Sequence, residues 1–140
     1  MAAGGAVPPC RAPQIAPALS GAATAAGTTH FTIALRNTGN LACTLAAYPT
    51  VTLIGGQASA PVQLPLREVE LGHAAPSLTL APGAAGTFVL SLADVPVDGS
   101  AICAHARGLA ITVDQTAINL AQPMVACGTM IGVFAIMSAP

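Results

Sequence analysis

The chain has 140 residues, of which 54% are hydrophobic and 6% charged, and its formal net charge is −1 at pH 7. This length fits one domain with a real core, and so apolar a chain is expected to fold rather than remain disordered. Its only fixed cations are four arginines spread along the sequence, so the basic stripe that nucleic-acid binding requires is missing.

The first nine residues are dominated by Ala, Gly and Pro. They lack the basic start and the apolar run of a signal peptide, so we interpret residues 1–9 as a flexible lead and residues 10–140 as a single domain. Cysteine usage favours an exported protein, and we therefore expect the signal or lipid-anchor segment of the precursor to be absent from this chain.

Short runs of alternating apolar and polar residues, separated by Gly, Pro and Asn clusters, predict β-strands in the first half of the chain. The clearest run is 29–38, where Phe31, Ile33 and Leu35 point to one face, and it ends in the turn sequence Asn-Thr-Gly-Asn. Further strands are expected at 43–47, 50–54 and 61–66. The prolines of the last run suit a sheet edge.

The second half continues the same pattern, with strands expected at 77–80, 86–92, 108–113, 117–120 and 130–137. The most apolar stretch, 124–137, carries no charge but is shorter than the roughly 18 residues of a membrane-spanning helix, so no transmembrane segment is expected in this chain. Roughly seven to nine short strands with frequent turns are typical of an all-β antiparallel sandwich, and we predict that fold class.

The four cysteines are Cys10, Cys43, Cys103 and Cys127. An even number at wide spacing, without the close pairs of a structural metal site, indicates a disulfide framework and an oxidising compartment. Four cysteines allow three pairings. Buried free thiols are the alternative, whereas a catalytic thiol needs a neighbouring base and an electropositive setting that the sequence does not show.

Two segments resemble the start of a metal site, and each has a simpler structural explanation. Cys103 and His105 lie two residues apart and share a strand face, but no second pair follows at the spacing of zinc ligands. Asp94 and Asp98 flank a glycine turn, yet the segment lacks the alternating ligands of a calcium loop and more simply caps a turn. We therefore predict no metal and no cofactor.

Other polar candidates also fit structural roles. Glu68 and Glu70 share a strand face, as a glycosidase carboxylate pair would, but one tyrosine and three phenylalanines provide few sugar-stacking platforms, so a solvated edge is favoured. We interpret His30 and His73 as strand-face and loop histidines. Tyr48 either recognises a ligand or, as we favour, packs its ring beside a disulfide. No catalytic residue is assigned.

Residues 37–49 read Asn-Thr-Gly-Asn-Leu-Ala-Cys-Thr-Leu-Ala-Ala-Tyr-Pro, and residues 80–83 read Leu-Ala-Pro-Gly ahead of an apolar strand. Together with the order of the cysteines, these motifs resemble a family of actinobacterial exported proteins and lipoproteins, domain of unknown function 4232, over about residues 10–137. The chain departs from the family pattern at Ala47, where glycine is usual, and after Val113, where a proline-rich run is expected.

The resemblance implies an immunoglobulin-like antiparallel β-sandwich outside the cell, with disulfides joining Cys10 to Cys43 and Cys103 to Cys127. It implies no known activity. We therefore expect a non-enzymatic, secreted or cell-envelope interaction module with an unknown protein or envelope partner. The first alternative is a structural subunit that self-associates through strand edges, because edges are usually guarded by charges and this chain has few. An uncharacterised enzyme is the second alternative, and no motif supports it.

Overall fold

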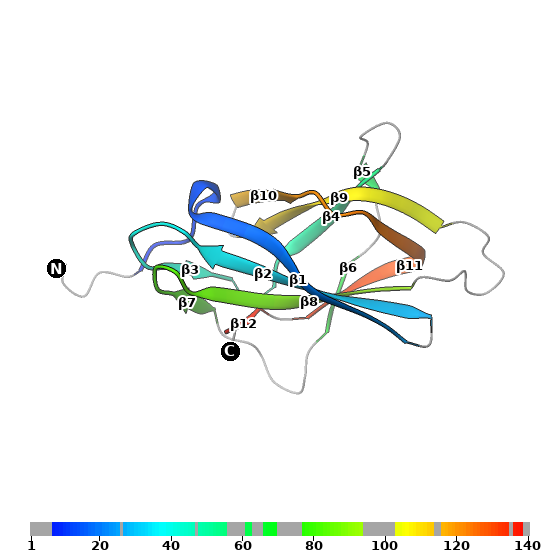
Figure 1. Cartoon of the computed structure of the whole chain (residues 1–140), viewed down its shortest axis with the longest axis horizontal. Helices are drawn as coiled ribbons and strands as arrows, with labels where there is room; N and C mark the ends of the chain where they lie inside the picture. Colours follow the sequence, from blue (N-terminus) through cyan, green and yellow to red (C-terminus); the bar gives the residue numbers. More distant parts are fainter. Residues whose placement is uncertain are drawn as a thin grey trace.

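The structure is a computed structural model that describes residues 7–25, 27–46, 48–55, 61–62, 66–69, 77–93, 103–113, 116–134 and 136–138. These residues form strands and one 3-10 turn, η1 (Ala12–Gln14), so the predicted all-β class is confirmed (Figure 1). Among them, no helix is long and apolar enough to cross a membrane. The predicted domain limits stay a prediction.

The described strands follow one another along the chain as β1 (Ile15–Ala25), β2 (Thr28–Asn37), β3 (Cys43–Leu45), β4 (Thr50–Gly55), β5 (Pro61–Val62), β6 (Leu66–Val69), β7 (Leu78–Leu80), β8 (Ala85–Ala93), β9 (Cys103–Val113), β10 (Thr116–Leu120), β11 (Met124–Phe134) and β12 (Met137–Ser138). One large sheet has the order β1-β2-β8-β11-β9-β4-β5, with β10 beside β9, β12 beside β8 and β6 beside β11. β3 and β7 pair separately. These pairs are antiparallel except for β6 with β11.

β11 joins the two halves of the large sheet. Its start pairs with β9, from Met124 opposite Ala106 to Cys127 opposite Cys103. After a shift of register, the end of β11 pairs with β8 and with β6. The strand therefore passes from one half of the sheet to the other and links them through its backbone.

Gly108 lies where β9 changes partner from β11 to β10. A Cβ atom at this position would lie only 2.9 Å from the carbonyl oxygen of Leu120, which is backbone and cannot move aside as a side chain does. Glycine is therefore required for the close approach of β9 to the end of β10.

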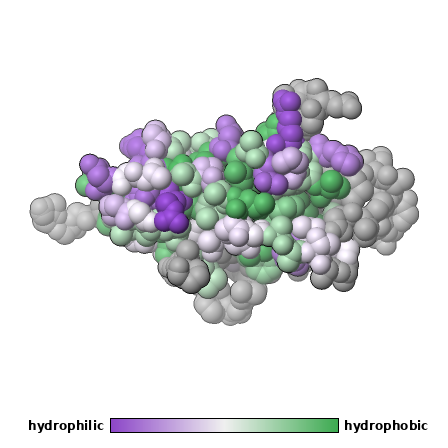
Figure 2. Space-filling view, in the orientation of Figure 1, coloured by the Kyte–Doolittle hydropathy of each residue, from purple (hydrophilic) through white to green (hydrophobic). Residues whose placement is uncertain are grey.

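The two halves of the sheet enclose one hydrophobic core. The even-numbered residues of β8 are buried and the odd-numbered ones half-exposed, as expected where successive side chains point to opposite faces. Ile33 and Leu35 of β2 and Leu109 and Ile111 of β9 are fully buried and belong to the same cluster. On the outside, green and pale residues cover much of the face shown in Figure 2, with hydrophilic residues gathered in separate patches.

Several elements differ from the sequence-based expectation. β9 and β11 begin at Cys103 and Met124, well before the strands predicted at 108–113 and 130–137. β1 was not predicted, because its sequence is rich in Ala, Gly and Pro and its register shifts between Leu19 and Gly21, which breaks the alternation. The edge strand predicted at 61–66 is confirmed in part, because β5 lies at the end of the sheet order and β6 begins at Leu66, whereas residues 63–65 lie outside the described residues. β5 pairs with β4, and β6 pairs in parallel with β11. By contrast, the strand predicted at 29–38 coincides closely with β2.

Candidate functional site

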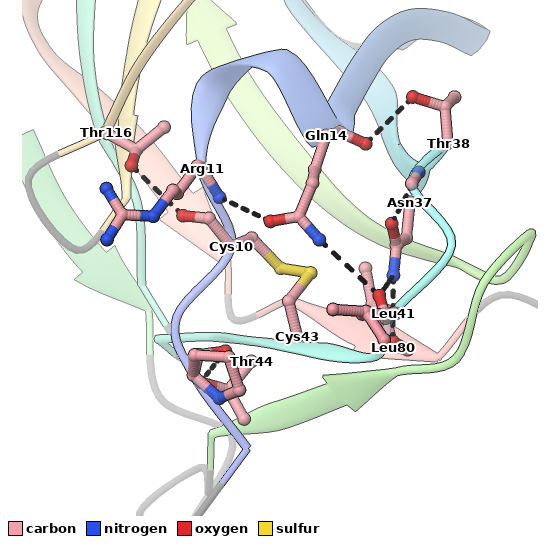
Figure 3. Close-up of a disulfide and its surroundings, with 12 residues drawn as sticks. Cys10, Arg11, Gln14, Asn37, Thr38, Leu41, Cys43, Thr44, Leu80 and Thr116 are labelled. Carbon is pink, nitrogen blue, oxygen red and sulfur yellow. Dashed lines mark hydrogen bonds between the residues drawn. A yellow bond between two sulfur atoms is a disulfide. The ribbon is translucent and has the colours of Figure 1, made fainter.

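A disulfide joins Cys10, which precedes η1, to Cys43, the first residue of β3 (Figure 3). The two sulfur atoms are 2.02 Å apart and the two Cα atoms 4.7 Å apart. Both side chains are buried, with exposed fractions of 2% and 0%. Of the two predicted disulfides, the structure shows this one.

Hydrogen bonds hold the same segment in place on either side. The backbone N–H of Cys10 donates to the Thr44 carbonyl and the Thr44 N–H to the Pro8 carbonyl, each at 2.9 Å. The Thr116 hydroxyl of β10 donates to the Cys10 carbonyl at 3.0 Å. Residues 8–10 therefore act as a short parallel strand beside β3, and the disulfide makes that pairing covalent.

Asn37, at the end of β2, is the one buried polar residue among those that the structure describes. Its side-chain amide donates to the carbonyls of Leu41 at 2.8 Å and Leu80 at 3.1 Å, and its oxygen accepts from the Gly39 N–H at 2.9 Å. A buried amide that was not paired in this way would destabilise the fold. Asn37 therefore fixes the turn after β2 against the end of β7.

The backbone of Asn37 also binds the turn between β7 and β8. Its N–H donates to the Ala84 carbonyl at 2.9 Å, and its carbonyl accepts from the Gly83 N–H at 2.7 Å. Gly83 has a φ of +83°, which a residue with a side chain rarely adopts. The Asn-Thr-Gly-Asn and Leu-Ala-Pro-Gly segments, more than forty residues apart along the chain, are therefore directly hydrogen-bonded to each other.

Gln14 of η1 completes the connection around the disulfide. Its carbonyl accepts the N–H of Thr38 at 2.7 Å and the Thr38 hydroxyl at 3.0 Å. Its side-chain amide donates to the Leu41 carbonyl at 3.4 Å, and its side-chain oxygen accepts the Arg11 N–H at 3.1 Å. Figure 3 shows Gln14, Thr38 and Leu41 close to the disulfide. Together with the backbone bonds of Asn37 to the turn before β8, these hydrogen bonds and the disulfide connect η1, β2, β3 and that turn.

Cys103 and Cys127 lie directly opposite each other where β9 pairs with β11. Opposed residues of antiparallel strands have Cα atoms about 4.5 to 5.5 Å apart, which is within the span of a disulfide. Their side chains lie outside the described residues. The second bond therefore stays a prediction, and the backbone register supports it.

An open hollow of about 500 Å³ lies on the outer face of the large sheet, across β1, β2, β8 and β11. Its lining includes Gly21 and Ala23 of β1, His30 and Thr32 of β2, Val89 of β8 and Phe134 of β11. Most of this lining is apolar, and His30 is the one titratable side chain that the described residues contribute. The hollow can therefore receive an apolar group and offer one imidazole for a hydrogen bond.

Two further candidates that the structure describes, His105 and Tyr48, are not among the residues that line the hollow. His105 is exposed on β9. Tyr48 is half-buried, and its packing beside a disulfide stays a prediction. Within the described residues, no three His, Cys, Asp or Glu side chains come together as a metal site would require. The remaining candidates lie outside the described residues. They are the side chain of Glu68 and the whole residues Glu70, His73, Asp94 and Asp98.

The chain belongs to the family described as domain of unknown function DUF4232, whose model matches residues 10–132. The matched region begins at the first disulfide cysteine and contains the hydrogen-bonded motifs around Asn37 and Gly83. No curated protein and no solved structure matches the chain. The match therefore confirms the family that the sequence resembles, and the description of that family names no function.

Proposed function

We propose that this DUF4232 domain is a non-enzymatic interaction module of an exported protein, built as an immunoglobulin-like β-sandwich and acting in the actinobacterial cell envelope or medium. The observation that carries the proposal is the buried disulfide between Cys10 and Cys43. Disulfides form and persist in oxidising compartments and are rare in the cytosol. A bond that holds the first residues of the matched region on β3 fits a domain that folds after export.

The outer hollow supports binding rather than catalysis. Enzyme sites commonly combine several convergent titratable groups, and the described residues bring one, the imidazole of His30, to the hollow. The surrounding Ala, Thr, Val and Phe side chains offer shape and apolar contact, and Gly21 leaves space open beside them. Such a surface favours an interaction whose free energy comes from burial and backbone hydrogen bonding.

The compartment is tested with the full-length precursor in an actinobacterial host. Cells are treated with a thiol-alkylating reagent before lysis, and the thiol state of the domain is then measured by mass spectrometry in the envelope, medium and cytosolic fractions. We expect the domain outside the cytosol with Cys10 and Cys43 protected from alkylation. A sample reduced before alkylation is the control. A domain found in the cytosol with both thiols alkylated would contradict the proposed function.

A further inference from the structure

The strand β1 forms one end of the large sheet. Among the described strands, only β2 pairs with it, so within the described part of the chain its other edge has no strand partner. Residues 21–25 have the sequence Gly-Ala-Ala-Thr-Ala and carry no charge. Ala22, Ala23 and Thr24 are exposed, although their side chains point alternately to the two faces of the sheet.

The two halves of β1 differ in how this edge is protected. The first half contains Pro17, which cannot donate a backbone hydrogen bond, and it directly follows η1, while β1 as a strand also contacts β10. At its end the register shifts around Ser20, whose hydroxyl donates to the Thr32 carbonyl at 3.2 Å. Residues 21–25 have neither proline nor charge, the usual means by which an exposed edge avoids pairing with another strand.

The outer hollow opens onto this unprotected part of the edge. Gly21 and Ala23 form its β1 side and have no side-chain atoms beyond Cβ, whereas Phe134 of β11 lies at its far side. A Cβ atom at Gly21 would meet nothing closer than the Thr32 Cβ at 4.0 Å, so the space above β1 is empty. A long side chain on a strand placed next to β1 can therefore lean over Gly21 toward His30 and Thr32.

We propose that the edge at residues 21–25 binds an extended, uncharged peptide segment of a partner protein by β-strand addition. Main-chain hydrogen bonds to β1 hold the segment, and apolar side chains at alternate positions enter the hollow between β1 and Phe134. This inference rests on the proposed function, because it names the surface and the class of partner that an interaction module of this fold would use.

The hollow favours such a segment over a second copy of this chain. Two β1 strands paired across a two-fold axis would place only Gly, Ala and Thr against each other, and both hollows would remain unfilled. A partner strand with leucine-sized side chains buries apolar surface in addition to forming backbone hydrogen bonds. Alternate side chains in a pocket also provide selectivity, which backbone pairing by itself does not.

The test uses the whole oxidised chain and three synthetic peptides. The probe alternates threonine and leucine and carries a fluorescent label at one end. The second peptide has the same composition with its leucines placed consecutively. The third has the probe sequence with every second backbone amide N-methylated, which removes the hydrogen-bond donors along one edge of the peptide. We expect saturable binding of the probe by fluorescence anisotropy, and affinities at least about tenfold lower for the other two peptides.

Three protein variants locate the binding surface. Gly21→Leu fills the mouth of the hollow without a backbone clash, so we expect about tenfold weaker binding of the probe, the value of one leucine-sized burial. Ala23→Lys guards the edge and is expected to weaken binding at least as much. Ala18→Lys is the matched control, because Ala18 is exposed on the outer face of the same strand ahead of Ser20, and it should change affinity less than about twofold.

Several results would overturn the proposal. They are the absence of saturable probe binding, equal affinity for the peptide with consecutive leucines, and equal loss of binding in Ala18→Lys and Ala23→Lys. Sedimentation that shows a dimer abolished by Ala23→Lys but not by Ala18→Lys would assign the edge to a second copy instead. The domain can be exported and oxidised and still fail to bind the probe. That result would refute the peptide site at residues 21–25 and leave the proposed function in place.

Discussion

Replacing Asn37 by alanine tests whether its buried amide holds the fold together around the disulfide. The substitution removes three hydrogen bonds, of which the one to the Leu80 carbonyl is buried and those to Leu41 and Gly39 are part-buried. A buried group left unpaired costs about 1 to 3 kcal/mol, and a lost part-buried bond about 0.5 to 1.5 kcal/mol. We therefore expect Asn37→Ala to lower the free energy of unfolding by about 4 kcal/mol.

Denaturant unfolding of the oxidised protein at neutral pH measures this loss, and thermal unfolding should show a midpoint about 10 to 20 °C lower. Asn40→Ala is the matched control, because Asn40 is exposed in the same turn, and its effect should stay within about 0.5 kcal/mol. Equal stability of the two variants would refute the role that we assign to the Asn37 amide.

Asn37→Asp separates hydrogen-bond chemistry from side-chain size. The carboxyl group keeps an acceptor for the Gly39 N–H but, when ionised, faces the carbonyl oxygens of Leu41 and Leu80. Burial and these oxygens raise the pKa of the aspartate in the folded state above its unfolded value of about 3.9. The variant is therefore most stable below the unfolded pKa and loses stability as pH rises through the folded pKa. A difference from the native protein that does not depend on pH would contradict this reasoning.

Three further predictions concern the disulfides and the backbone. Replacing Cys10 and Cys43 together by alanine should lower the free energy of unfolding by about 4 kcal/mol in the loop-closure model, because the bond spans a sequence separation of 33, and an unchanged denaturant midpoint would contradict this estimate. Peptide mapping without reductant should yield a second cross-linked peptide pair containing Cys103 and Cys127, whereas two free thiols per chain would show that their backbone register does not lead to a bond. Gly108→Ala should lower the free energy of unfolding by about 1 to 3 kcal/mol, because its Cβ would meet the Leu120 carbonyl. Gly21→Ala is the control and should unfold like the native protein, because the space at Gly21 is open. Equal denaturant midpoints for the two variants would show that β9 and β10 can separate without cost.

The parts of the fold that could be predicted from the sequence are those with uninterrupted alternation. Residues 29–38 were assigned correctly because Phe31, Ile33 and Leu35 alternate with small or polar residues along a strand that lies between β1 and β8 and has no bulge. β1 was not predicted, because a strand at the sheet edge needs little apolar side-chain volume. In addition, the register shift at Ser20 interrupts the alternation of apolar and polar residues. The hollow could not be predicted either, because Gly21 and Ala23 of β1 line one of its sides.

Asn37 illustrates a signal that was present in the sequence. Period-2 alternation continues from Ile33 and Leu35 to Asn37, so the same pattern that predicts the core also places an asparagine on the buried face. A buried asparagine must find partners for its amide, and turns supply free backbone groups. Interpreting Asn37 only as a turn residue therefore missed its role. Its partners Leu80 and Gly83 could not be identified, because they lie more than forty residues away.

The residues that identify the family and those that we propose to bind a partner have different structural roles. Cys10, Cys43, Asn37 and Gly83 connect η1, β2, β3 and the turn before β8 at one end of the fold. The edge at residues 21–25 contributes to neither the disulfide nor the network of Asn37. Its composition can therefore change without disturbing that framework. The proposed binding of a partner strand therefore depends on the side chains that this edge and the hollow present, and not on the residues around the disulfide.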